Sequence, residues 1–153
     1  MSLIIDSIKA SIDFDCECMQ IMLQLLQQEE AALLSDQFEI LEELTPLKDN
    51  IVSQLQNSSE QRNELFAQIQ NGSDTFTVWL DQQEHPDLVK SWSKLMELTG
   101  QSKEINATNG LLLNQLVVRN QRFLAFFKGE NDSSLYGPDG LNMSKPIGSV
   151  LKG

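Results

Sequence analysis

The sequence is poor in the side chains that carry most catalysis and metal binding. It contains one histidine, His85, and two cysteines, Cys16 and Cys18. A lone histidine leaves no good base for a nucleophile, and one Cys-x-Cys pair without a second pair of ligands is weak evidence for a metal site. No glycine-rich phosphate loop is present, because Gly137 and Gly140 flank a Pro-Asp turn. We therefore expect no enzyme, cofactor or metal. A small metal-handling protein that uses the two cysteines is a weaker alternative.

Long apolar runs are also missing. No segment approaches the roughly 20 apolar residues of a membrane span. The N-terminus shows no basic region followed by an apolar core, which a secretory signal would have. One residue separates Cys16 from Cys18, a spacing that strains a disulfide and favours a reducing compartment. We therefore expect a cytoplasmic protein without stable membrane insertion.

Basic residues are scarce, above all in the first half of the chain. The sequence has 22 acidic and 11 basic residues and a net charge of -11. Residues 1–70 hold 13 of the acids and three of the bases. Nucleic-acid phosphates and anionic membranes repel such a chain. Runs such as Glu42-Glu43 are typical of a solvated helix face, so we expect the acidic half to stay in solvent or to face a basic partner.

Glycine is absent from residues 1–71, and apolar residues recur there at helical spacing. The stripe consists of Met19, Met22, Leu26, Leu33, Ile40, Leu44, Leu47, Ile51 and Leu55. It predicts a helix over 19–57, because residues three, four or seven apart share one helical face. Residues 12–18 alternate with period two, as a strand does, but they also fit a helix, which we favour. Thr45-Pro46 predicts either a kink or a new helix with Thr45 as its N-cap.

Short helices are predicted between the two long segments. Ser58 and Gln61 fit a capping box that restarts a helix. A second short helix, capped by Ser73, would carry three apolar residues, namely Phe76, Trp79 and Leu80. These pieces can pack over one end of the long helices as a third element.

The last long segment runs from Asp87 to about Lys128. One heptad-spaced line follows it: Leu88, Trp92, Leu95, Thr99, Ser102, Asn106, Asn109, Leu113, Leu116, Asn120, Phe123 and Phe127. The middle of this line is polar, which argues against an unbroken coiled coil. At about 1.5 Å per residue the two long helices would span roughly 58 and 63 Å. We predict an all-α fold in which these helices form an antiparallel hairpin or bundle over 1–128, followed by a mobile C-terminal tail over 129–153.

The end of the last helix is more apolar than a hairpin requires. Leu111 and Val118 lie opposite the heptad line. A third element or a second copy of the chain would bury them in one interpretation, and in the other they line a groove for a partner helix. The tail adds apolar residues too sparse to fold alone. The candidate protein-binding residues are Leu111, Val118, Phe126, Leu135, Tyr136, Leu141, Ile147, Val150 and Leu151.

These features resemble the flagellar export chaperone family of FlgN type. The matching residues occur in order along most of the chain: 25–33, Asp36, 41–44, Lys48, Arg62, Trp92, Leu95, 106–110 and 136–140. The moderately specific part is Asn-x-x-Asn-Gly before an apolar helix, followed by Tyr-Gly and a nearby glycine. Pro46 departs from the uninterrupted first helix of that family.

The resemblance implies a chaperone that binds the C-terminal helical regions of the hook–filament junction proteins (FlgK- and FlgL-like). It implies that the chaperone keeps them unassembled and delivers them to components of the flagellar export apparatus, with the last helix and the tail as the binding part. A structural coiled-coil adaptor that dimerises or tethers, without an export role, is the rival hypothesis. The sequence leaves open whether the chain forms a homo-oligomer.

Overall fold

The computed structural model describes residues 2–69, 75–82 and 84–128, and the side chains of 3–121 within these ranges. Helices α1 (Ser2–Leu34), α2 (Phe38–Ile69), α3 (Phe76–Asp81) and α4 (Pro86–Lys128) account for nearly all of them. The described residues form no strand, so the predicted all-α class is confirmed. The predicted tail, 129–153, lies outside the described residues.

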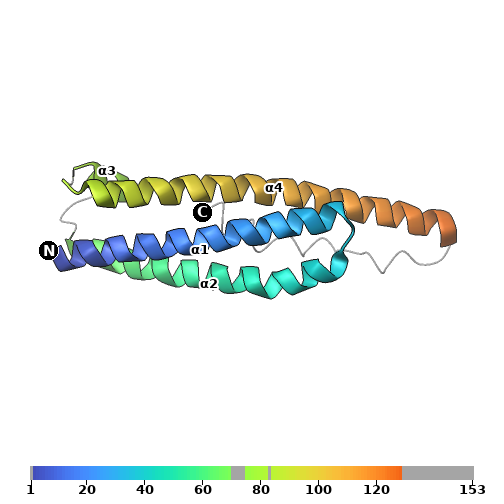
Figure 1. Ribbon diagram of the computed structural model, residues 1–153, viewed down its shortest axis with the longest axis horizontal. Coiled ribbons are helices and arrows are strands. Elements are labelled where there is room, and N and C mark those ends of the chain that lie inside the picture. The colour runs from blue at the N-terminus through green and yellow to red at the C-terminus, as the bar shows by residue number, and fades with distance from the viewer. Residues whose placement is uncertain (1, 70–74, 83, 129–153) are drawn as a thin grey trace.

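Helix α1 lies between α2 and α4, and each of these packs along it (Figure 1). Contacting pairs advance together along α1 and α4: Cys16 with Ser91, Leu26 with Asn109, and Asp36 with Arg119. They run in opposite directions along α1 and α2: Ser11 with Ser58, Cys18 with Gln54, and Glu29 with Lys48. Thus α2 is antiparallel to α1 and α4 is parallel to it. The predicted helical bundle is confirmed, but the described residues form three long helices where two long rods were predicted.

The predicted helix over 19–57 is interrupted at residues 35–37. Asp36 adopts a φ of 57°, the left-handed region that short polar side chains tolerate. The turn is completed by Gln37 N–H, which donates to the Ala32 carbonyl at 2.9 Å. Because the turn uses an aspartate and no glycine, the sequence carried no strong signal of it. The apolar stripe continues on both sides, and both helices bury most of it in the core. The exception is Leu47, which was predicted to belong to the buried stripe but is 51% exposed.

Helix α2 continues through both of its predicted interruptions. Pro46 lies inside it, and Thr45 is no N-cap: its Oγ1 donates to the Leu41 carbonyl at 3.0 Å. The capping box at Ser58 was also wrong, because Ser58 is buried in mid-helix against Ser11. The predicted short helix after it does form as α3, although its N-cap is Thr75. Ser73 lies outside the described residues.

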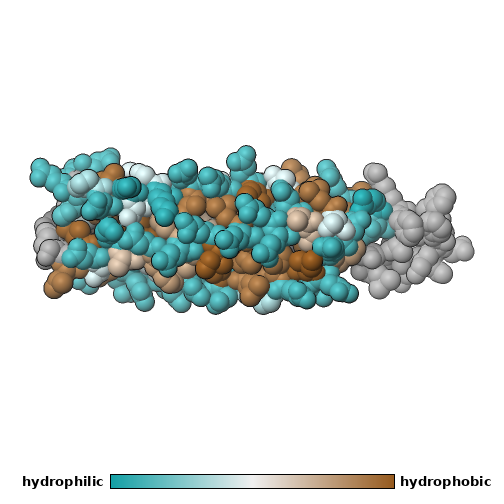
Figure 2. Space-filling view, in the orientation of Figure 1, coloured by the Kyte–Doolittle hydropathy of each residue, from teal (hydrophilic) through white to brown (hydrophobic). Residues whose placement is uncertain are grey.

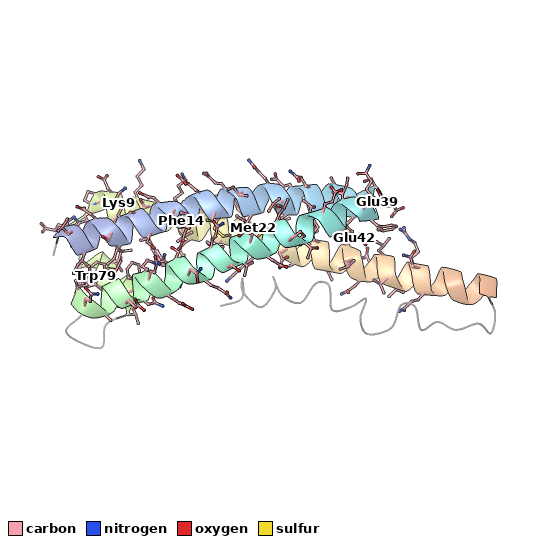
Figure 3. All side chains as sticks on the ribbon, turned by 90° about the horizontal axis from the view of Figure 1, so that it is seen from below. Lys9, Phe14, Met22, Glu39, Glu42 and Trp79 are labelled. Atoms are coloured by element: carbon pink, nitrogen blue, oxygen red, sulfur yellow. The ribbon has the colours of Figure 1, made fainter. Side chains whose placement is uncertain are left out.

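The core is built around α1, because that helix has neighbours on two sides. Ile8, Ile12, Met22 and Leu26 are wholly buried. Residues 12–18 are helical, as favoured, and their alternation reflects the broad buried face of a central helix. Near the α3 end the core closes with an aromatic cluster of Phe66, Phe76, Trp79 and Trp92. Trp79 lies at that end of the rod, and Glu39 lies at the opposite end, close to the α1–α2 turn (Figure 3).

Candidate functional site

The outer face of α4 holds the candidate residues that the structure describes. The predicted heptad line faces α1: Leu88, Leu95, Ser102, Asn109 and Leu116 are all buried. Leu111 and Val118 lie on the opposite side of the helix, where 65% and 42% of their surface is exposed. They line an open hollow with Asn114, Gln115 and Arg119. Neither α1 nor α2 buries this apolar surface.

The other candidate residues are placed only in part. Phe126 belongs to α4 by its backbone, but its side chain lies outside the described residues. The candidate residues of the tail lie wholly outside the described residues: Leu135, Tyr136, Leu141, Ile147, Val150 and Leu151. Helix α4 extends past the α1–α2 turn (Figure 1). The structure therefore brings together Leu111 and Val118 from the predicted set.

Sequence reasoning missed the polar residues that accompany this face. Asn114 and Gln115 fall between the two apolar residues at helical spacing, which the sequence could have indicated. Arg119 Nη2 donates to Asp36 Oδ1 at 3.0 Å, across a separation of 83 residues that no local pattern predicts. This exposed ion pair joins the hollow to the α1–α2 turn.

A buried polar cluster sets the register of α4 on α1. Asn109 Nδ2 donates to the Leu26 carbonyl at 2.9 Å and to Glu29 Oε1 at 3.0 Å. Lys48 Nζ donates to Glu29 Oε2, which connects α2 to the same carboxylate. Glu29 is therefore a structural anchor, and not part of a fully solvated acidic face. Since a buried polar group costs free energy when it loses its partners, these bonds disfavour any slip of α4 along α1.

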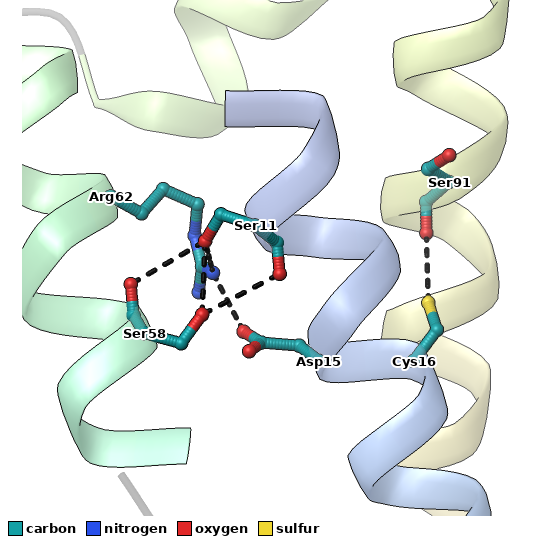
Figure 4. A network of polar contacts seen from close by, with 6 residues as sticks. All are labelled: Ser11, Asp15, Cys16, Ser58, Arg62 and Ser91. Atoms are coloured by element: carbon teal, nitrogen blue, oxygen red, sulfur yellow. Dashed lines mark hydrogen bonds and ion pairs between the residues drawn. The ribbon is translucent and has the colours of Figure 1, made fainter. Parts of the chain in front are cut away.

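A second polar cluster joins α1, α2 and α4 near the α3 end (Figure 4). Arg62 Nη1 donates to Asp15 Oδ2 at 2.6 Å and to Ser11 Oγ at 3.0 Å. Its guanidinium lies over the Trp92 ring, 5.9 Å from the centroid. Only 4% of the Asp15 side chain is exposed, so the carboxylate depends on this arginine for its charge partner.

The two cysteines face different helices. Cys16 Sγ donates to the Ser91 carbonyl of α4 and Cys18 Sγ to Gln54 Oε1 of α2, each at 3.6 Å. Burial raises the pKa of both thiols above the ordinary value. Within the described ranges, no group of three or more histidine, cysteine or acidic side chains is arranged to hold a metal ion. No helix in those ranges is long and apolar enough to cross a bilayer.

Comparison with known proteins links this bundle to one family. The FlgN family model, described as FlgN protein, matches residues 1–143. The flagella synthesis protein FlgN of Proteus mirabilis is 28% identical over 137 residues, which cover 88% of this chain and 89% of that protein. The protein of the same name from Yersinia enterocolitica serotype O:8 is 26% identical over 140 residues, covering 90% of each. The one from Salmonella typhimurium is 30% identical over 98 residues, covering 58% of this chain and 64% of that protein.

Among solved structures none gives a significant match. The family match extends over all four helices and past the end of α4. It also includes the partly buried Arg62, the buried Asn109 and the exposed Leu111 and Val118. The resemblance drawn from the sequence is confirmed: the chain belongs to the FlgN family.

Proposed function

We propose that this chain is a flagellar export chaperone that binds the C-terminal helical regions of hook–filament junction proteins (FlgK- and FlgL-like). It acts in the cytoplasm by binding, without catalysis. It keeps those regions unassembled and delivers them to the export apparatus. The observation that carries the proposal is the exposed apolar face of Leu111 and Val118, opposite the buried line of the same helix.

The proposed binding step is supported by the exposure of this face. An amphipathic helix of the junction protein lays its apolar side against Leu111 and Val118, and residues 129–153 close over it. Asn114 and Gln115 offer amide groups for hydrogen bonds beside the apolar residues. Ordering a segment on binding costs free energy, so the affinity is moderate and release at the export apparatus is feasible.

Calorimetry with the C-terminal fragment of a junction protein tests the proposal. Deleting 129–153 should weaken binding more than about tenfold, or about 1.4 kcal/mol, while circular dichroism shows intact helices. Leu111→Ser with Val118→Ser should weaken it by a similar factor. Met96→Ser is the matched control, because Met96 is an exposed apolar residue of α4, 43% exposed, far from this face. Unchanged affinity in the truncated chain with intact helicity would exclude the tail as a binding element.

The rival adaptor hypothesis has less support. A coiled-coil adaptor would offer its heptad line to a partner, whereas this line is buried against α1. Sedimentation of the free chain measures self-association directly, and a dimer that forms through Leu111 and Val118 would favour the adaptor.

A further inference from the structure

A shallow groove runs between α1 and α2, and its lining includes no residue of α4. The lining residues include Ser7, Ser11 and Phe14 of α1. They also include Gln54, Ser58 and Leu65 of α2. Residues from each helix recur at three- and four-residue intervals, so the groove follows the direction of both helices. Figure 2 shows hydrophobic surface where α1 and α2 lie side by side, most of it from the middle of the hairpin toward the α1–α2 turn.

The groove has a small polar floor and apolar edges. The hydroxyls of Ser11 and Ser58 lie 3.0 Å apart and hydrogen-bond to each other, so the floor holds short side chains with satisfied polar atoms. Phe14 is 43% exposed, and Ile21, seven residues further along α1, is 46% exposed. Short side chains let a partner backbone approach closely, and the apolar edge offers surface to bury. This shape fits a helix better than a loop.

The charges beside the groove that have no ion-pair partner among the described residues are negative. All three bases of residues 1–70 form ion pairs with acids of α1: Lys9 with Asp13, Lys48 with Glu29, and Arg62 with Asp15. Glu17 lies one turn beyond Phe14, and Glu60 and Glu64 each precede a groove residue on α2. These three acids are exposed and make no ion pair with a described residue.

We infer that the α1–α2 groove is a second docking surface, which binds a basic amphipathic helix of a partner protein. The apolar stripe of that helix packs on Phe14 and Leu65, and its lysines or arginines lie against Glu17, Glu60 and Glu64. The inference does not require the binding face proposed above for Leu111 and Val118 on α4, called the cargo face below. The groove and the cargo face share no residue.

Charge and chain composition favour this occupant over two others. A second copy of the chain carries a net charge of -11 and would bring acids against acids. The chain's own segment 140–153 has Lys145 and Lys152, but Pro146 and Gly148 between them disfavour a continuous helix. A basic helix from another protein meets neither obstacle.

A designed peptide tests the groove on the full-length chain. A helical peptide of about 18 residues, with leucines at three- and four-residue spacing and lysines on both flanks, covers the groove, which spans about 16 Å along α2. Fluorescence anisotropy measures its affinity. Carbodiimide coupling, which joins a lysine amine directly to a carboxylate, locates it by mass spectrometry. We expect cross-links from the peptide to Glu17, Glu60 or Glu64.

Matched variants distinguish binding of the peptide in the groove from attraction by the net negative charge of the chain. Phe14→Ser should weaken binding of the peptide at least about fivefold. Phe38→Ser should not weaken it, because Phe38 lies outside the groove although it is 45% exposed. The triple change Glu17→Gln, Glu60→Gln and Glu64→Gln should weaken it at least about tenfold. Two control sets should bind normally: Glu39→Gln with Glu42→Gln and Glu43→Gln, which removes the same charge, and Leu111→Ser with Val118→Ser, which alters the cargo face.

Several results would overturn the inference. Equal loss in both glutamate triples would mean that only net charge attracts the peptide. A loss in the Leu111 and Val118 variant as large as in Phe14→Ser would place the peptide on the cargo face. Cross-links from Lys145 or Lys152 to the three acids in the free chain would assign the groove to the tail or, in a covalent dimer, to a second copy.

Discussion

At the scale of single residues, Arg62 connects more of the molecule than any local pattern in the sequence indicates. It pairs with Asp15 and Ser11 of α1, and its guanidinium lies over Trp92 of α4. The sequence presents it as one base in an acidic segment and as one residue of the family resemblance, without its contacts. Its role arises because the turn at Asp36 folds α2 back along α1 and brings residues 47 positions apart into contact.

Arg62→Ala should destabilise the fold by about 3 kcal/mol, because it leaves the Asp15 carboxylate buried without its charge partner. Arg119→Ala is the matched control: its ion pair with Asp36 is 65% and 57% exposed, so the loss should stay below about 1 kcal/mol. Urea unfolding measures both. Arg62→Met combined with Asp15→Leu should cost less than Arg62→Ala alone. Arg62→Met alone keeps most of the stem but still strands the charge, so it should cost nearly as much as Arg62→Ala. A much smaller cost would mean that packing of the arginine stem, and not the stranded charge, dominates.

We expect the two buried thiols to lower the free energy of unfolding in alkali. Their pKa is raised by burial, so the unfolded chain ionises them first. The stability that they contribute is complete below the ordinary thiol pKa of 9.0 and is lost as the pH rises past it. The urea midpoint should therefore fall further between about pH 8 and pH 10.5 in the natural chain than in the Cys16→Ala and Cys18→Ala double variant. Parallel falls in the two proteins would show that lysine titration alone is responsible.

At the scale of elements, α4 combines an inner line that is polar in its middle with an apolar outer patch, which departs from the pattern of an ordinary surface helix. Ser102 and Asn109 are buried against α1, while Leu111 and Val118 are exposed. The polar line keeps one register, because Asn109 has its partners only at Leu26 and Glu29. The helix thereby holds its outer face in a fixed position relative to the hairpin.

Helix α4 also contains two glycines that its packing does not require. A Cβ atom added at Gly100 or Gly110 meets no heavy atom within 4 Å. Gly100→Ala and Gly110→Ala should each stabilise the protein by about 0.5–1 kcal/mol, since alanine loses less backbone freedom on folding. Thermal unfolding measures the gain, and Ala107→Gly, at an exposed position between them, should produce a loss of similar size. A destabilised glycine variant would indicate that the helix must bend at that position.

At the scale of the whole molecule, the charge is divided between two kinds of surface. The exposed acids of α1 and α2 have no free base beside them among the described residues of 1–70. The proposed cargo face on α4, around Leu111 and Val118, is apolar and carries Arg119. The proposed docking to a basic partner and the proposed capture of cargo therefore depend on different forces.

Salt should separate the two steps. Exposed charges are screened beyond about 10 Å at 0.1 M salt, whereas apolar burial is not. Raising NaCl from about 50 to about 300 mM should weaken binding of the lysine-flanked peptide at least about tenfold. Binding of the junction-protein fragment should change less than about threefold. Calorimetry at both concentrations measures the two steps, and equal sensitivity would contradict the division of surfaces.

Sequence periodicity alone determined the all-α class, the buried line of α4 and the position of Leu111 and Val118 on the opposite face of that helix, whereas their exposure was decided by the structure. Each depends on the 3.6-residue helical repeat, which places residues on faces without knowledge of their neighbours. The family resemblance was also readable from the sequence, because it depends on residue order.

Tertiary structure alone decided how the helices are joined and which side chains meet. The turn at Asp36 uses no glycine, and Pro46 is tolerated inside α2, so local signals pointed to the wrong helix boundaries. The contacts of Arg62 with Asp15 and of Asn109 with Glu29 span 47 and 80 residues. The α1–α2 groove depends on the same long-range pairing. Periodicity assigns a residue to a face of its own helix, but the partner of that face is set by the free energy of packing the whole chain.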